Sequence, residues 1–232
     1  MTASVARLQP QAISSRSQST RAKLVRTAER LFAERGVDSV SLNEISRAAE
    51  QRHSNVCQYH FGDRDGLIQA IIDKHVPGIV AAREAMLDAL AAETRDGPEA
   101  MVRAFVRPVA AKLSDPDGGV AFIRFSAQMI AANVLRLDGQ GPYRFTVPGI
   151  DELNRRLIHA VRGQNLSEAA RRDRLTMASI MLFQGLAVYS TLREARGGEG
   201  AGSDRDLDRF VADLERMIVG ALTAPVSSEG AP

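Results

Sequence analysis

A run of short polar and planar side chains between residues 52 and 59 has the chemistry needed to bind nucleic acid. Ser54, Asn55, Gln58 and Tyr59 carry hydroxyl, amide or phenol groups that hydrogen-bond to base edges and phosphates. The Gln58 amide is suited to bidentate pairing with adenine, and Arg52 stands just before these residues, where a phosphate backbone would run. The pattern predicts a base-reading surface if these side chains share one helix.

The other reactive side chains do not form a catalytic or metal-binding pattern. The four histidines are scattered along the chain, at His53, His60, His75 and His159. They lack zinc-ligand spacing, and the chain shows no nucleophile elbow or phosphate-cradling loop. The single cysteine, Cys57, is interpreted as a packed small hydrophobe, with a redox switch as the alternative. We therefore predict no catalytic residue, no metal and no cofactor; an enzyme with a helical core is the disfavoured alternative.

Two helices are predicted ahead of the polar run. Apolar residues recur at helical spacing over residues 20–35, and Gly36 is placed to stop that helix. Ser41 and Glu44 then form a capping box, and Val40 and Ile45 form a hydrophobic staple around it. This second helix is short, and its N-terminal amides are able to face a phosphate.

A third short helix is predicted from residue 54 to residue 60, with Val56 and Cys57 facing inward and the polar residues facing out. Three short helices with a tight polar turn between the second and third are typical of a helix-turn-helix. The sequence therefore predicts that the polar run lies on a recognition helix that enters the major groove.

The rest of the chain also reads as helical. Asp63 is a good N-cap for a helix that Pro77 should bend or split before it resumes from residue 79 to about residue 90. Further helices are predicted at about 98–114, 118–136, 150–163, 167–195 and 204–222, with a loop at 137–149 and a glycine-rich linker at 197–202. The expected fold class is all-α. The expected organisation is a disordered arm at 1–19, a helix-turn-helix domain at 20–63, a larger helical domain at 64–222 and a disordered tail at 223–232.

Charge and composition fit a cytoplasmic DNA-binding protein. Residues 1–60 hold nine Lys or Arg against five Asp or Glu, although the net charge of all 232 residues is only +2. A polyanionic partner would therefore meet the N-terminal part. No apolar run is expected to reach the length of a membrane span, and no signal peptide is recognised. We predict double-stranded DNA as a partner and no membrane.

Three segments resemble the DNA-binding domain of the tetracycline-repressor (TetR) family: LFAERG at 31–36, SLNEISRAA at 41–49 and QYHFGDRDGL at 58–67. The resemblance covers about a quarter of the chain. It implies that Ser41 and Asn43 abut a phosphate, that Tyr59 and His60 touch the backbone or hold the recognition helix down, and that Arg64 meets a phosphate. Glu50 departs from the family pattern, because it stands where a turn glycine is usual. The turn is also longer than usual, so Arg52 and His53 fall either in the turn or on the reading face.

The resemblance further implies a homodimer whose C-terminal domain binds a small apolar or amphipathic molecule. The candidate cavity residues are Met86, Phe105, Phe122, Phe125, Met129 and Met181. The candidate dimer contacts, on the last two long helices, are Gln184, Leu186, Tyr189, Phe210, Leu214 and Met217. Simple core packing is the alternative for the cavity residues. The function this implies is a repressor released from a pseudo-palindromic operator by its ligand, and the alternative is a helix-turn-helix protein that senses no small molecule.

Overall fold

The structure, a computed structural model, describes residues 15–92, 97–134, 142–160, 166–195 and 204–225. Within these ranges all regular structure is helical, as the sequence predicts. The first fourteen residues, the linker at 197–202 and the tail from residue 226 lie outside the described residues.

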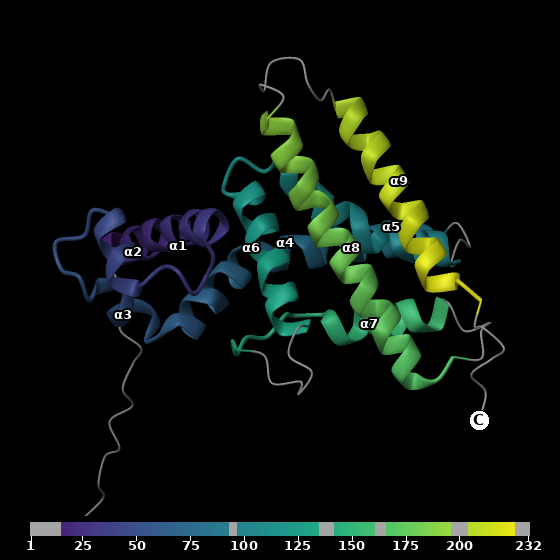
Figure 1. The fold of residues 1–232 in the computed structure, drawn as a ribbon, viewed down its shortest axis with the longest axis horizontal. Helices are drawn as coiled ribbons and strands as arrows, with labels where there is room; N and C mark the ends of the chain where they lie inside the picture. The colour runs from purple at the N-terminus through teal and green to yellow at the C-terminus, as the bar shows by residue number, and fades with distance from the viewer. Residues whose placement is uncertain (1–14, 93–96, 135–141, 161–165, 196–203, 226–232) are drawn as a thin grey trace, which may run out of the picture.

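Three helices form an N-terminal bundle: α1 (Ser15–Arg35), α2 (Leu42–Ala48) and α3 (Val56–Phe61). The bundle lies at one end of the molecule (Figure 1). The expectation of disorder up to residue 19 is wrong for residues 15–19, because the stretch before the apolar stripe contains no helix breaker and simply extends α1. Gly36 ends α1 with a φ of 89°, a left-handed conformation that glycine adopts without strain.

Helix α4 (Arg64–Ala92) leads from the bundle along one side of the molecule. It passes through Pro77 without interruption, so the sequence expectation that it might be split there is wrong. Proline removes one backbone hydrogen bond. Val76 and Ile79 are buried on either side of it, and this packing holds the helix together.

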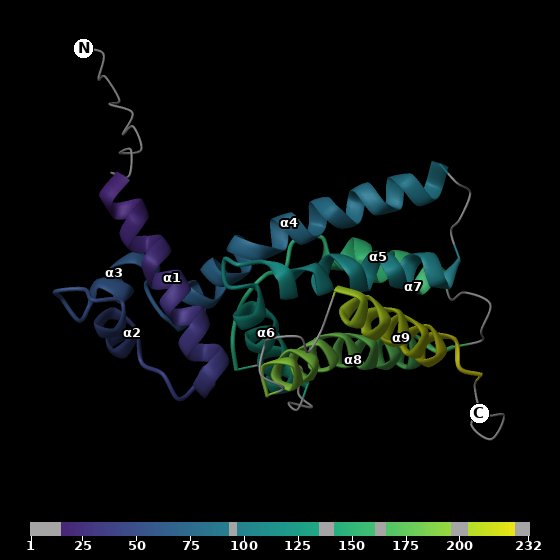
Figure 2. The same cartoon turned by 90° about the horizontal axis from the view of Figure 1, so that it is seen from above.

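The body consists of the remaining helices: α5 (Pro98–Ala110), which continues as a 3-10 turn (Ala111–Ser114), α6 (Gly119–Val134), α7 (Ile150–Ala160), α8 (Glu168–Ala195) and α9 (Asp204–Thr223). Helix α6 lies between the N-terminal bundle and the rest of the body (Figure 1). Figure 2 shows α8 and α9 on the opposite side of the body from α4, with α5 and α7 between them.

Helix α8 is long and apolar enough, by length and composition alone, to cross a membrane. This corrects the expectation that no apolar run reaches such a length, since residues 175–192 contain no charged side chain. Ala178, Leu182 and Leu186 of α8 are buried, and α8 packs against α6 and α9. A packed helix of a helical body accounts for the same composition.

The bundle and the body share one hydrophobic core, because α1 packs on α6. The ring of Phe32 on α1 stacks on that of Phe125 on α6, with centroids 6.1 Å apart. At the end of α1, the Gln128 side chain donates a hydrogen bond of 3.1 Å to the Ala33 carbonyl. The N-terminal bundle is therefore seated on the body through α1 as well as joined to it by α4.

Candidate nucleic-acid interface and apolar cavity

The turn between α2 and α3 is built by hydrogen bonds at both of its ends. The Ser41 side chain caps α2 by accepting from the Glu44 amide at 3.2 Å, as the capping box predicts. Arg35 and the Ser41 amide hold the Glu44 carboxylate and lower its pKa. At the other end, the buried Ser46 hydroxyl accepts from the Cys57 amide at 3.0 Å and so ties α3 to α2.

Glu50 occupies a strained position in this turn. Its φ is 55°, and in the described part of the chain it is the one non-glycine residue with a positive φ. This explains why a glycine is the usual residue in the pattern that the chain resembles. The Glu50 carboxylate pairs with Lys23 of α1, which lowers the pKa of Glu50. The glutamate therefore fits the turn at the cost of backbone strain.

The predicted polar face is exposed. The side chains of Ser41, Asn43, Arg52, Ser54, Asn55, Gln58 and Tyr59 all lie at the surface. Tyr59 is 84% exposed and so does not belong to the core of the bundle. A large aromatic side chain held this far out of a well-packed domain is poised for an external partner.

The recognition helix starts later than the sequence predicts. It begins at Val56, so Ser54 stands in the turn and Asn55 is the N-cap residue. The Asn55 side chain makes no cap hydrogen bond, which leaves its amide for a phosphate or base. Arg52 and His53 belong to the turn. Glu50, with its positive φ, lies at the start of this turn.

His60 and Arg64 lie at the edge of this surface and contact the protein itself. Partial burial, and then the charge of Arg21, lower the pKa of His60 and so favour its neutral ring. The Arg21 guanidinium lies over the Phe61 ring at 5.1 Å and helps to seat α3 on α1. Arg64 donates to the Val37 carbonyl. Both His60 and Arg64 therefore help to position the bundle.

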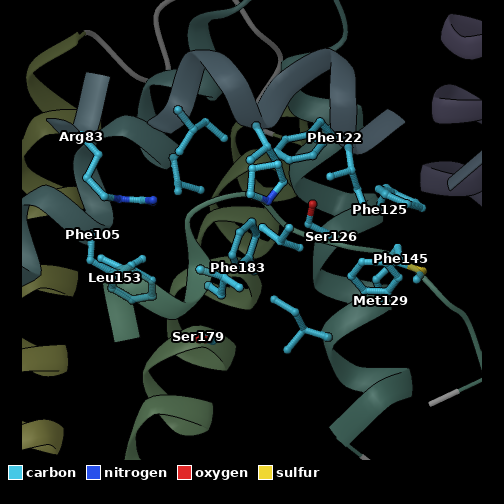
Figure 3. A pocket seen from close by; sticks show the side chains of 18 residues that line it. Arg83, Phe105, Phe122, Phe125, Ser126, Met129, Phe145, Leu153, Ser179 and Phe183 are labelled. Atoms are coloured by element: carbon cyan, nitrogen blue, oxygen red, sulfur yellow. The ribbon is translucent and has the colours of Figure 1, made fainter. Parts of the chain in front are cut away.

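An apolar cavity of about 260 Å³ lies in the body, walled by α4, α5, α6, α7 and α8. Figure 3 shows its lining side chains. Four predicted cavity residues line it: Phe105, Phe122, Phe125 and Met129. Met86 and Met181 are not among the lining residues, so their assignment is corrected; helical spacing does not say which side of a helix faces the cavity.

The lining also contains residues that the sequence analysis missed. Arg83, Ser126 and Phe145 reach the cavity from α4, α6 and the loop before α7. Sequence alone gave one usable signal for Arg83, which is a cation within a largely apolar stretch of α4. Phe145 lies in a segment read as a loop, where no periodicity marks an inward-facing residue.

The candidate dimer residues divide into buried and exposed groups. Leu186 and Leu214 are buried inside the protomer, which corrects their assignment, because a side chain without free surface cannot contact a partner. Tyr189 of α8 packs on Phe210 of α9, with ring centroids 4.7 Å apart, and the Gln184 side chain donates to the Ala127 carbonyl on α6 at 3.2 Å. Met217 is 52% exposed on α9.

Three further apolar side chains are exposed on α8, namely Met177, Val188 and Leu192. Their spacing places them along one side of the helix. Exposed apolar side chains gathered on one helix mark an interaction surface. With Met217 they make up what we call the α8–α9 apolar face.

A buried polar cluster connects the bundle, α4 and the body. The Glu29 carboxylate of α1 is almost completely buried and bonds the His75 ring on α4 through one oxygen. Its other oxygen accepts from Lys74 at 2.9 Å, and Lys74 also donates to the Asp117 carbonyl, just before α6, at 2.7 Å. The His75 ring stacks on Phe122 at 4.4 Å. We call these residues the Glu29 cluster; the signal for it in the sequence is an acidic residue on the apolar face of α1.

The capped second helix, the ordered turn and the exposed polar third helix define a helix-turn-helix DNA-binding domain. Residues 24–71, from α1 into α4, match the family model described as bacterial regulatory proteins, tetR family. This N-terminal part of the chain is therefore a helix-turn-helix DNA-binding domain of the tetR type.

Solved structures share its fold at low sequence identity. An alanine-substituted HlyIIR protein is 16% identical, with a TM-score of 0.50 over 91% of this chain and 99% of that one. CprB, a TetR-family protein from S. coelicolor, is 20% identical, with a TM-score of 0.46 over 87% of this chain and 98% of that one. A gamma-butyrolactone receptor (ArpA-like protein) is 18% identical, with a TM-score of 0.46 over 88% of this chain and 98% of that one. No curated protein sequence matches the chain.

Proposed function

We propose that the chain is a dimeric repressor that binds a pseudo-palindromic operator through α3 and leaves it when a small, largely apolar molecule enters the cavity. The observation that carries the DNA-binding part is the exposed polar face of α3, with Tyr59 at 84% exposure on a bundle whose interior is fully packed. Two copies related by a two-fold axis would present two such helices to successive major grooves. The α8–α9 apolar face is the surface we assign to the dimer contact.

The cavity supports a sensing function over a regulator without a ligand. Phe122 and Phe125 line the cavity. Each ring also contacts a residue that is not part of the cavity lining: Phe122 stacks on His75, and Phe125 stacks on Phe32 of α1. A ligand that displaces these rings therefore acts on the Glu29 cluster and on α1, and shifts the bundle relative to the body. In this proposal the signal passes from α6 to α1 as well as along α4.

DNA binding is tested with the duplex upstream of the chain's own gene, by fluorescence anisotropy at several stated salt concentrations. Wild type should bind specifically, and the logarithm of its association constant should fall linearly with the logarithm of salt concentration. Gln58→Ala should weaken specific binding about 5-fold to 150-fold because a base contact is lost. Its melting temperature should stay unchanged, because the side chain is exposed.

Ser114→Ala, an exposed polar change in the body, is the matched control and should bind like wild type. Equal affinity of wild type for the upstream duplex and for a shuffled duplex would contradict the operator proposal. Equal affinity of Gln58→Ala and wild type would remove Gln58 from the reading face.

A further inference from the structure

Among the described residues that line the cavity, Arg83 is the one cation, and the rest are apolar apart from Ser126 and Ser179. Arg83 of α4 is half-buried, and its Nε donates to the Ala104 carbonyl at 3.2 Å. Figure 3 shows the side chain extending along the wall with its guanidinium toward the cavity. Among the described residues this is its single hydrogen bond, so the two terminal nitrogens remain as donors in a fixed fork.

The charge of Arg83 is not neutralised by a paired carboxylate. Among the residues that the structure describes, none of those lining the cavity is acidic. The acidic neighbours, Glu84 and Glu152, line an adjoining groove that Arg83 also borders. Glu152 is paired with Arg155 and Arg156, and Glu84, exposed on α4, forms no ion pair with Arg83 within the described ranges. Burial lowers the pKa of Arg83 and the nearby charge of Glu84 partly opposes that shift, and a guanidinium stays protonated at neutral pH.

A cation held partly out of water without a direct ion pair is costly, and Glu84 acts on Arg83 only through its charge. A ligand that brings an anion offsets that cost and gains charge-assisted hydrogen bonds from the fork. The remainder of the lining favours an apolar and flat body, because five of the chain's eight phenylalanines surround the space: Phe105, Phe122, Phe125, Phe145 and Phe183.

Size further restricts the ligand. A volume of about 260 Å³ lies just below the roughly 300–1,000 Å³ of ligand pockets in general, so the cavity fits a small molecule. The geometry points to a small organic carboxylate with an aromatic or compact apolar body as the ligand, its carboxylate on Arg83 and its body among the phenylalanine rings. This inference rests on the proposed sensing function and specifies the ligand class.

Three probes with one body and different head groups test it by titration calorimetry on the DNA-free protein: 3-phenylpropionate, 3-phenylpropan-1-ol and 3-phenylpropylammonium. Wild type should bind the carboxylate most tightly and the ammonium least. Arg83→Gln should weaken carboxylate binding about 10-fold to 100-fold and leave the alcohol unchanged. Arg83→Lys keeps the positive charge but loses the forked pair of donors, so its affinity for the carboxylate should lie between those of wild type and Arg83→Gln.

Arg103→Gln is the matched control, since it removes an exposed arginine from the neighbouring helix α5 and should leave all three affinities unchanged. Alcohol binding as tight as carboxylate binding in wild type would overturn the inference. Failure of 3-phenylpropionate to bind wild type at millimolar concentration would also overturn it. So would an Arg83→Gln variant that melts at the same temperature as wild type and binds 3-phenylpropionate as tightly as wild type does. Operator release is measured separately: Arg83-dependent binding without release supports the anion site and contradicts the proposed sensing function.

Discussion

At the scale of single residues, the turn of the helix-turn-helix contains backbone strain at Glu50. Glu50 stands in the left-handed region with a φ of 55°, where a β-carbon is disfavoured. Its pairing with Lys23 is an exposed contact, which contributes little to stability. The conformation is instead held by the backbone bonds on either side, from Glu50 to the Arg47 carbonyl and from Gln51 to the Ser46 carbonyl.

Glu50→Gly should relieve this strain. Glu50→Gln is its partner variant, because it also removes the pairing with Lys23 but keeps the β-carbon. We expect the glycine variant to melt about 2–4 °C above the glutamine variant, measured by circular dichroism. A glutamine variant as stable as the glycine variant would show that the turn stores no strain at this position.

Cys57 illustrates how burial controls reactivity. Its side chain is inaccessible to solvent, and burial raises the pKa of its thiol to about 11. Because the reactive form is the thiolate, folded protein at pH 8 should resist iodoacetamide, whereas protein unfolded in guanidinium should be alkylated rapidly. Mass spectrometry of both samples measures this. Rapid alkylation of the folded protein would support the redox-switch alternative for Cys57.

At the scale of elements, the Glu29 cluster is the contact through which α1, α4 and the start of α6 are held together. Gly118, just before α6, has a φ of 85° and sits against this cluster. A β-carbon there would lie 3.0 Å from the Glu29 Cδ and would displace the carboxylate. Gly62, at the end of α3, has a similar φ of 78° but has open space around it.

These two glycines form a matched pair of positions. Gly62→Ala should lower the free energy of unfolding by about 1 kcal/mol, from the backbone alone. Gly118→Ala should lower it by about 3 kcal/mol or more, because a buried charge also loses its partners. Urea unfolding followed by circular dichroism measures both. Equal losses would show that the Glu29 cluster tolerates displacement and is not a rigid connection.

At the scale of the whole molecule, three features lie apart from one another. Helix α3 lies at one end, the cavity lies inside the body, and helices α8 and α9, which carry the α8–α9 apolar face, lie on the side away from α4 (Figure 2). In the proposed dimer, the distance between the two α3 helices depends on how each bundle sits on its own body. On that proposal, a small shift at α6 would decide whether an operator fits.

Val188→Asp should break the dimer, because it places a charge on the α8–α9 apolar face, where Val188 is 55% exposed. Light scattering after size exclusion should show a monomer with unchanged helicity, and operator affinity should fall with it. Ala81→Asp, exposed on α4, is the control and should leave the oligomeric state unchanged. A Val188→Asp variant that stays dimeric would contradict the assigned interface.

The sequence by itself determined the local features of this protein. The Ser41 cap, the Gly36 stop and the apolar stripe of α1 were all predictable, because capping and helical period depend on residues within a few positions of one another. The exposed polar run of the recognition helix followed from the same local pattern. Its starting point did not, because the left-handed backbone at Glu50 is set by the packing of the whole turn.

Only the tertiary structure decided which residues meet across the chain. Leu186 and Met217 have similar apolar character and helical spacing, yet one is buried in the protomer and the other is half exposed, because α6, α8 and α9 pack in a way that no short window encodes. The pairing of Glu29 with His75 spans α1 and α4. The place of Arg83 beside five phenylalanines from distant parts of the chain was also beyond local reasoning. Burial and charge pairing depend on contacts between residues far apart in sequence, and this is why the exposed polar run could be predicted and the full cavity lining could be predicted only in part.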